Sequence, residues 1–401
     1  MTVAGTDRYT IISADCHAGG SHEQYREYLE AEWIDEFDAW RGEYSNPFRD
    51  LQDDGRSRNW DDSRRVTDLE ADGQVAEVTF PNTVPPFFPT GTVIARLPTT
   101  PEDYRRRWAG IRAHNRWLAD FCARHPARRA GVFQIFIDDL DAAIAEVRWA
   151  HEHGLRGGAL IPGIPDDSDL APYYSDAYDP LWAVCQDLGV IVNNHTTGSG
   201  LPDYGKHPSS TIQWMIETAW YAHRPLWQMV MSGVFDRFPQ LKLVLTEQGC
   251  DWVPGLLAQL DAFHGMMQSG RIGEMNLSND MRLPLTPTEY FRRNVWIGVS
   301  FPSPRETGPM RHLGLDRVMW GSDYPHNEGT SPHSRESLRR TFHDWNPDDL
   351  RQVLSGTAAN LYGFDLAVLD PLGAEFGPTV DEVAVPLDKI PKGVFSPAFY
   401  K

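Results

Sequence analysis

The chain has 401 residues, of which 41% are hydrophobic and 23% charged, proportions typical of a soluble globular protein. Its net charge of -19 argues against nucleic acid and anionic membrane surfaces as partners, because both carry negative charge themselves. Four cysteines without paired spacing, a short polar N-terminus and the lack of a long apolar run predict a cytoplasmic protein with reduced thiols and no membrane contact.

Short apolar, β-branched segments recur along the chain, and most intervals between them have the periodicity of amphipathic helices. The predicted strands are 9–14, 75–80, 131–136, 156–162, 190–195, 241–247, 295–300 and 317–323. Helices are expected within 101–124, 139–153, 179–188, 209–238 and 251–267. This alternation predicts a (β/α)₈ TIM barrel, a single domain over residues 1–364. An open doubly wound sheet is the alternative, but no glycine-rich phosphate loop follows any strand.

Three segments depart from the alternation. Residues 19–65 form a long acidic and aromatic insertion after the first strand, and a loop rich in Phe and Pro follows the second. In a barrel both belong to the C-terminal face, where active sites lie, so we expect a lid or pocket wall rather than plain surface loops. The predicted substrate contacts are Asn82, Phe87 and Tyr324. Residues 365–401 are expected to form a C-terminal arm on the barrel or on a neighbouring chain, and a homodimer is the expected assembly.

Three strand ends carry polar side chains that packing does not explain. Asp15 and His17 follow the first strand, His195 ends the fifth, and Asp323 ends the eighth. Asp15 and His17 are two residues apart on an extended segment, so both side chains leave the same face. An unpaired buried carboxylate is costly, and a cation is one way to compensate it. Because a barrel brings these strand ends together, the sequence predicts a metal site made by the four residues.

Carboxylates mixed with imidazoles suit Zn²⁺, with Mn²⁺ and Fe²⁺ as alternatives. No lysine ends the fourth strand, so a carbamylated lysine cannot bridge two ions there, and one divalent ion is expected. Glu247 ends the sixth strand and is predicted to be a general base or a further ligand, rather than a cap of the next helix. His326 follows Asp323 by three residues and is predicted to donate a proton or anchor a substrate carboxylate, unless it is a loop histidine in solvent.

Four segments together resemble the amidohydrolase-related metalloenzymes, a group that includes aminocarboxymuconate-semialdehyde decarboxylase and γ-resorcylate decarboxylase. They are Ser13-Ala14-Asp15-Cys16-His17, Phe238-Pro239-Gln240-Leu241-Lys242, Trp320-Gly321-Ser322-Asp323-Tyr324-Pro325-His326 and Asn360-Leu361-Tyr362-Gly363-Phe364. The resemblance covers most of residues 9 to 364 and implies a (β/α)₈ barrel with one divalent ion. It places the ligands of the family on Asp15, His17, His195 and Asp323.

Two positions differ from the family pattern. Asp15 stands where members commonly carry His or Glu, and Glu247 replaces the catalytic histidine that characterised decarboxylases carry after the sixth strand. Because a glutamate can take a proton from metal-bound water, the sequence predicts first a mononuclear metal-dependent hydrolase of a small aromatic or cyclic substrate, with Glu247, His326 and Asp323 as its catalytic residues.

Two other functions remain open. One is a metal-dependent non-oxidative decarboxylase of an aromatic or enol acid, for which burial would have to raise the pKa of Glu247. The other is a non-catalytic barrel that only binds a ligand. That hypothesis expects degenerate ligand positions, whereas all four are present here.

Overall fold

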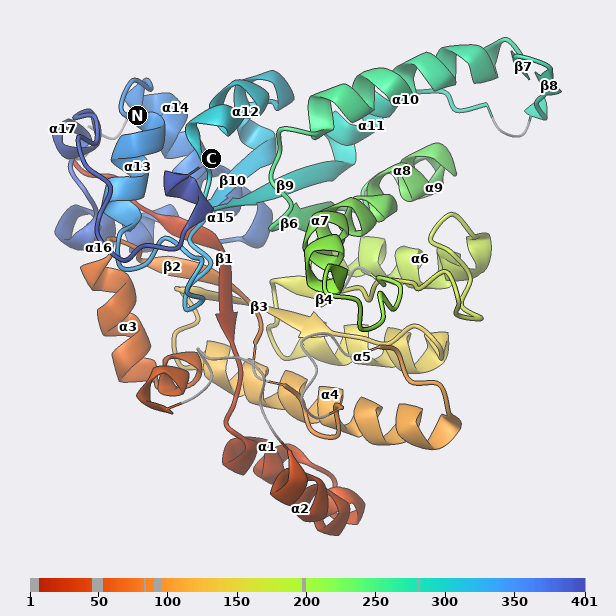
Figure 1. Cartoon of the computed structure of the whole chain (residues 1–401), viewed down its shortest axis with the longest axis horizontal. Coiled ribbons are helices and arrows are strands. Elements are labelled where there is room, and N and C mark those ends of the chain that lie inside the picture. The colour runs from red at the N-terminus through yellow and green to blue at the C-terminus, as the bar shows by residue number, and fades with distance from the viewer. Residues whose placement is uncertain are drawn as a thin grey trace.

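Eight parallel strands pair side by side in chain order, and helices surround them (Figure 1). The computed structural model describes residues 7–44, 53–82, 84–89, 96–196, 200–279 and 282–400. The strands of the barrel are β1 (Ile12–Ala18), β2 (Ala76–Pro81), β3 (Arg129–Gln134), β4 (Gly158–Leu160), β5 (Val192–His195), β6 (Leu243–Thr246), β9 (Val295–Ser300) and β10 (Val318–Gly321). The predicted TIM-barrel fold is therefore confirmed, as is each of the eight predicted strands.

The barrel closes between its first and last strands at a seam just beyond the end of β10. The backbone N–H of Asp323 donates to the carbonyl of Asp15 at 2.8 Å, and the N–H of His17 donates to the carbonyl of Tyr324 at 2.7 Å. Residues from the two ends of the barrel sequence thus become neighbours at the C-terminal face, as the metal-site prediction requires.

The helices between the strands follow the predicted intervals, with one exception. The surrounding helices are α4 (Pro101–Ala123), α5 (Leu140–Glu152), α6 (Asp179–Leu188), α7 (Ser210–Ala222), α8 (Arg224–Met231), α9 (Val234–Arg237), α10 (Val253–Gln268), α11 (Pro287–Asn294), α12 (Thr307–Leu313), α13 (Ser334–Phe342), α14 (Pro347–Arg351) and α15 (Thr357–Tyr362). The interval 209–238 contains three helices, because Pro225 starts a new helix and Gly233 has a left-handed backbone with φ of 75°. A small hairpin of β7 (Arg271–Ile272) and β8 (Met275–Asn276) follows α10.

The insertion after β1 carries helices α1 (His22–Tyr28), α2 (Ile34–Glu43) and α3 (Asp62–Ala71), while residues 45–52 lie outside the described part. Arg65 of α3 is fully buried and fixes the insertion to the barrel. Its Nη1 donates to the carbonyls of His17 and Arg58, at 2.8 and 3.0 Å, and its Nη2 lies 2.5 Å from the Glu77 carboxylate of β2. The insertion is therefore anchored directly behind the end of β1.

The C-terminal arm packs on the barrel of its own chain. It contains α16 (Leu366–Phe376) and α17 (Val380–Val383), and it binds the segment before β1 through Tyr9 N–H to Pro378 O, at 2.9 Å, and Val380 N–H to Asp7 O, at 2.8 Å. Near its end, Phe399 is only 1% exposed. Of the two predicted positions for the arm, the structure shows the one on its own barrel, and the homodimer stays a prediction.

In the part of the chain that the structure describes, none of the helices combines the length and the apolar character needed to cross a membrane.

Candidate metal centre and active site

The four predicted ligands meet inside the C-terminal end of the barrel. His17 Nε2 lies 3.3 Å from Asp15 Oδ1 and 3.3 Å from Asp323 Oδ1, and His195 Nε2 lies 3.6 Å from Asp15 Oδ1. None of the four residues is more than 4% exposed. Distant parts of the sequence thus bring ligand atoms of Asp15, His17 and His195 within 4.8 Å of one another, and His17 also forms such a group with Asp323 and His326.

The donor set fits a single divalent ion. Two ligand atoms at about 2.1 Å from one tetrahedral ion stand about 3.4 Å apart, close to the 3.3 and 3.6 Å that separate Asp15 Oδ1 from His17 Nε2 and from His195 Nε2. Among the described residues, Asp15 Oδ1, His17 Nε2 and Asp323 Oδ2 are buried and have no hydrogen-bond partner. Buried polar atoms are normally satisfied, so these atoms fit the ligands of a cation.

Neighbouring groups point the ligand atoms toward that cation. His17 Nδ1 lies 3.1 Å from the carbonyl of Pro81, which can only accept a hydrogen bond, so Nδ1 carries a proton and the Nε2 edge of the ring is turned toward Asp15. The Ser300 hydroxyl at the end of β9 donates to Asp15 Oδ2, which leaves Oδ1 for the ion. Ser300 contacts a predicted ligand and was not among the residues predicted from the sequence. Only its place at a strand end could have indicated it.

Ser300→Ala is expected to lower the affinity for the divalent ion about 10- to 100-fold, because such supporting hydrogen bonds orient a ligand. Metal titration of the purified protein measures this. Ser355→Ala is the control, since Ser355 is also buried but donates to the carbonyl of Arg351, in the helical segment that follows α14. Equal affinities in the two variants would contradict the assigned role.

The charges of the cluster favour a cation. Burial by itself would raise the pKa of Asp15, but His17 and His195 outweigh it and hold this pKa well below its usual value. Burial lowers the pKa of His195, which favours the neutral imidazole that a metal needs. Burial also works to lower the pKa of His17, but Asp15 and Asp323 raise it well above its usual value, so His17 is the histidine from which an incoming ion must displace a proton.

Two residues of the site have an unusual backbone. Glu247 and Asp323 adopt left-handed conformations, with φ of 60° and 61°. A non-glycine residue in this region costs of the order of 1–3 kcal/mol, and such strain clusters at functional sites. Glu247 directly follows β6, and Asp323 is the second residue after β10, so both left-handed turns lie where a barrel strand ends.

Glu247 stands between the metal cluster and an open cavity. Its Oε2 lies 3.5 Å from Nδ1 of His195, and its side chain is 14% exposed. The cavity has a volume of about 520 Å³, and its lining includes Glu247 and Ser300 together with Trp214, Met215 and Arg305. Burial, together with the Asp323 and Asp15 carboxylates, raises the pKa of Glu247 well above its usual value. The raised pKa favours the protonated form of Glu247, which lies at the edge of a space large enough for a small substrate.

His326 is part of the cluster and not a loop histidine in solvent. Its Nδ1 lies 2.8 Å from Asp323 Oδ1, its Nε2 lies 3.0 Å from Asn82 Oδ1, and its ring centroid is 4.2 Å from that of His17. Burial tends to lower the pKa of His326, but the Asp323 carboxylate raises it above the usual value.

The three predicted substrate contacts have different surroundings. Asn82 contacts His326, as described above. Phe87 is 2% exposed and packs against Phe37 of the insertion, with ring centroids 6.1 Å apart. Tyr324 is 2% exposed, and its hydroxyl donates to Asp68 Oδ2 at 2.8 Å. The structure does not bring Phe87 and Tyr324 into the ligand cluster, and their contact with a substrate stays a prediction.

Phe80 of β2 is the aromatic residue that lies at the cluster, and the sequence analysis did not single it out. Its ring centroid is 4.9 Å from that of His195 and 6.0 Å from that of His17. Phe80 is fully buried at the end of a predicted strand. An apolar residue at such a position is expected in the hydrophobic core, so the sequence does not distinguish Phe80 from residues that only pack there.

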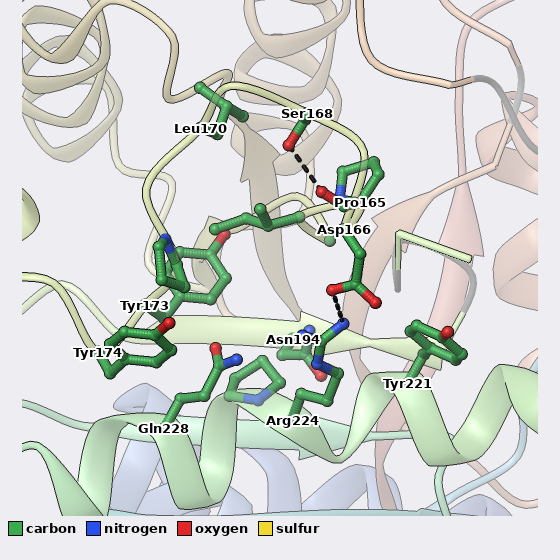
Figure 2. A pocket seen from close by; sticks show the side chains of 14 residues that line it. Pro165, Asp166, Ser168, Leu170, Tyr173, Tyr174, Asn194, Tyr221, Arg224 and Gln228 are labelled. Carbon is green, nitrogen blue, oxygen red and sulfur yellow. Dashed lines mark hydrogen bonds and ion pairs between the residues drawn. The ribbon is translucent and has the colours of Figure 1, made fainter. Parts of the chain in front are cut away.

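A second cavity, of about 200 Å³, lies on the other side of β5 (Figure 2). It is bounded by the loop after β4 and by α8, and the ion pair of Asp166 with Arg224, at 2.7 Å, spans it. Asn194 lines this cavity while the next residue, His195, faces the metal cluster, because successive side chains of a strand point to opposite faces.

Comparison with known proteins agrees with this architecture. The sequence profile of the Amidohydrolase family (Amidohydro_2) matches residues 60–364. Gamma-resorcylate decarboxylase of Rhodococcus jostii is 28% identical over 228 residues, which cover 53% of this chain and 65% of that enzyme, just under two thirds of its length.

Two solved structures share the fold. The 5-carboxyvanillate decarboxylase of Novosphingobium aromaticivorans, complexed with manganese and 4-hydroxy-3-methoxy-5-nitrobenzoic acid, has a TM-score of 0.64 at 18% identity, over 90% of this chain and 98% of that one. The dihydroxybenzoic acid decarboxylase of Polaromonas sp., with bound manganese and 2-nitroresorcinol, has a TM-score of 0.60 at 19% identity, over 88% of this chain and 97% of that one. Since the family profile covers most of the barrel and the ligand cluster lies within the barrel, the chain belongs to the amidohydrolase family.

Proposed function

We propose that this protein is a metal-dependent, non-oxidative decarboxylase of a small aromatic acid that carries a hydroxyl group. The observation that supports this best is the position of Glu247, a carboxylic acid with a raised pKa between the metal cluster and the cavity. The named relatives are decarboxylases of such acids, so they favour this reaction over the hydrolysis that the sequence predicts first.

The proposed metal ligands are the four residues predicted from the sequence. Asp15, His17, His195 and Asp323 would hold one divalent ion, which supplies positive charge for the carboxylate and hydroxyl oxygens of the substrate. Zn²⁺ was the first choice from the residue types, but the manganese in the two solved relatives makes Mn²⁺ the first ion to test.

The reaction needs a proton at the ring carbon that bears the carboxylate. The Glu247 carboxyl group donates this proton, and a C–H bond forms at that carbon. The carbon–carbon bond to the carboxylate then breaks, its electron pair returns to the ring, and CO₂ leaves. Glu247, now a carboxylate, recovers a proton from water in the cavity. His326 stays bound to Asp323 and holds that carboxylate in place.

The proposal predicts one ring deuterium for each CO₂ released in D₂O. We would incubate Mn²⁺-loaded protein with 2,6-dihydroxybenzoate and with 5-carboxyvanillate, and follow CO₂ and product by mass spectrometry. Aromatic esters, amides and lactones form the comparison panel. Turnover confined to that panel would overturn the proposal in favour of the hydrolase, in which Glu247 accepts a proton from water.

The hydrolase remains the second candidate, because Glu247 stands where the decarboxylases that the sequence resembles carry a histidine. The pH profile separates the two reactions. A decarboxylase needs protonated Glu247, so kcat falls as pH rises through its raised pKa, whereas a hydrolase needs the carboxylate, so kcat rises through the same range.

A further inference from the structure

A line of hydrogen bonds connects the metal cluster to the long insertion after β1. His326 Nδ1 contacts Asp323 Oδ1, His326 Nε2 contacts Asn82 Oδ1 at 3.0 Å, and Asn82 Nδ2 donates to Asn59 Oδ1 at 2.6 Å. The line ends where Asn59 Nδ2 donates to the backbone carbonyl of Arg56 at 2.9 Å. Asn59 of the insertion is thus connected to the proposed ligand Asp323 by three successive hydrogen bonds.

The direction of every bond in the line follows from its last member. A backbone carbonyl can only accept a hydrogen bond, so the Asn59 amide must present its NH₂ to Arg56 and its oxygen to Asn82. Asn82 must then present its own NH₂ to Asn59 and its oxygen to His326. The Nε2 of His326 is therefore a donor to Asn82, and its Nδ1 donates to Asp323, because a carboxylate can only accept.

Asn59 is well suited to fix this orientation. Asn59 is fully buried. Its backbone carbonyl accepts a hydrogen bond from the backbone N–H of Gly19, just beyond β1, at 3.3 Å. The adjoining carbonyl of Arg58 accepts from Arg65, which also binds the carbonyl of His17. The segment 58–59 is therefore tied at two points to the strand that supplies Asp15 and His17.

We propose that Asn59 is a positioning residue of the active site, which orients the Asn82 amide and through it the ring of His326 against Asp323. This role rests on the proposed function for its effect on turnover, but its effect on the histidine ring does not depend on any activity. It also gives the insertion a defined part in the site, in addition to the predicted role of a lid.

The test compares Asn59→Leu with Asn294→Leu. Asn294 is 1% exposed, and its Nδ2 donates to the carbonyls of Pro239 and Leu241 at 3.0 and 2.7 Å, so both substitutions remove a buried amide that bonds to backbone. Asn294 ends α11, before β9 and away from the ligand strand ends, so its loss measures the structural cost alone. Asn59→Asp is the third variant, because its carboxyl group keeps an acceptor oxygen for Asn82.

Two readouts are compared, the spectrum in protein loaded with diamagnetic Zn²⁺ and the kinetics in Mn²⁺-loaded protein. In the nitrogen–proton spectrum of ¹⁵N-histidine-labelled protein, the His326 signals, identified by their loss in His326→Gln, should shift or broaden in Asn59→Leu and stay in place in Asn294→Leu. For the decarboxylation, kcat should fall about tenfold in Asn59→Leu at nearly unchanged KM, because a misplaced group near the reacting atoms is enough for such a loss. Asn59→Asp should recover most of the kcat and the His326 signals.

The two proposals can fail separately. Unchanged His326 signals in Asn59→Leu would overturn the positioning role, whatever the protein catalyses. Shifted signals in a protein that releases no CO₂ from any aromatic acid would sustain the positioning role and overturn the decarboxylase.

Discussion

Asp323→Asn should remove the bound ion and lower kcat/KM about a thousandfold or more. Removing a supporting hydrogen bond to a ligand typically lowers metal affinity or activity about 10- to 100-fold, and loss of the ligand itself should have a larger effect. Asp323 lies 3.3 Å from His17 Nε2 and 2.8 Å from His326 Nδ1, so the amide removes a charge at the centre of the cluster. Metal analysis of the purified protein, expected to fall from about one ion per chain to nearly none, checks this result.

Asp349→Asn is the control for Asp323→Asn. Its carboxylate forms an ion pair with Arg311 at 3.2 Å, with both side chains at least 40% exposed, so it adds little to stability and nothing to the site. A full complement of metal in Asp323→Asn would show that the ion lies elsewhere, and the assigned ligand set would then be wrong.

Glu247→Gln should lower kcat about 10²- to 10⁴-fold while leaving the metal content unchanged, because a proton donor acts in the transition state and does not hold the ion. The amide has nearly the shape of the acid but cannot give up a proton. The falling limb of the pH profile, which comes from the raised pKa of Glu247, should disappear with it. Steady-state kinetics over a range of pH, together with metal analysis, measure these changes.

Asp349→Asn is also the control for Glu247→Gln, since the Asp349 side chain is 40% exposed and does not line the cavity. It should change kcat by less than about twofold, as a surface substitution does. Loss of the ion in Glu247→Gln would instead make Glu247 a ligand, the other role that the sequence left open.

The strand ends could be predicted from the sequence because their signals are local. Asp15, His17, His195 and Asp323 each follow a short apolar run, and a barrel of parallel strands has only one face where such ends can meet. The lengths of the strands were less predictable. β4 has three residues instead of the predicted seven, since Gly158 has a φ of 94° and a side chain there would collide with the carbonyl of Ile191.

The surroundings of the ligands could not be predicted, because they depend on tertiary contacts. Asn59 lies in an insertion whose place against β1 is set by the buried Arg65, and nothing in its local sequence distinguishes it from other polar loop residues. Phe87 shows the same limit, since an aromatic residue in a Pro-rich loop is equally compatible with a pocket wall and with the core under α2, where it lies. The raised pKa of Glu247 also follows from burial and from carboxylates that are distant in sequence.

An ion at the proposed site would also hold the barrel closed at the seam between β1 and β10. Asp15 and His17 stand on one side of the seam and Asp323 on the other, so an ion bound by all three links the first strand to the last. In the unfolded chain these ligands are far apart, so they do not bind one ion together. The free energy of metal binding therefore contributes to the stability of the closed barrel. During synthesis the three residues cannot bind one ion together until Asp323, beyond the last strand, has left the ribosome. Chelation should accordingly loosen the seam first, and hydrogen exchange should rise at the amides of His17 and Asp323 before it rises in β3 to β5.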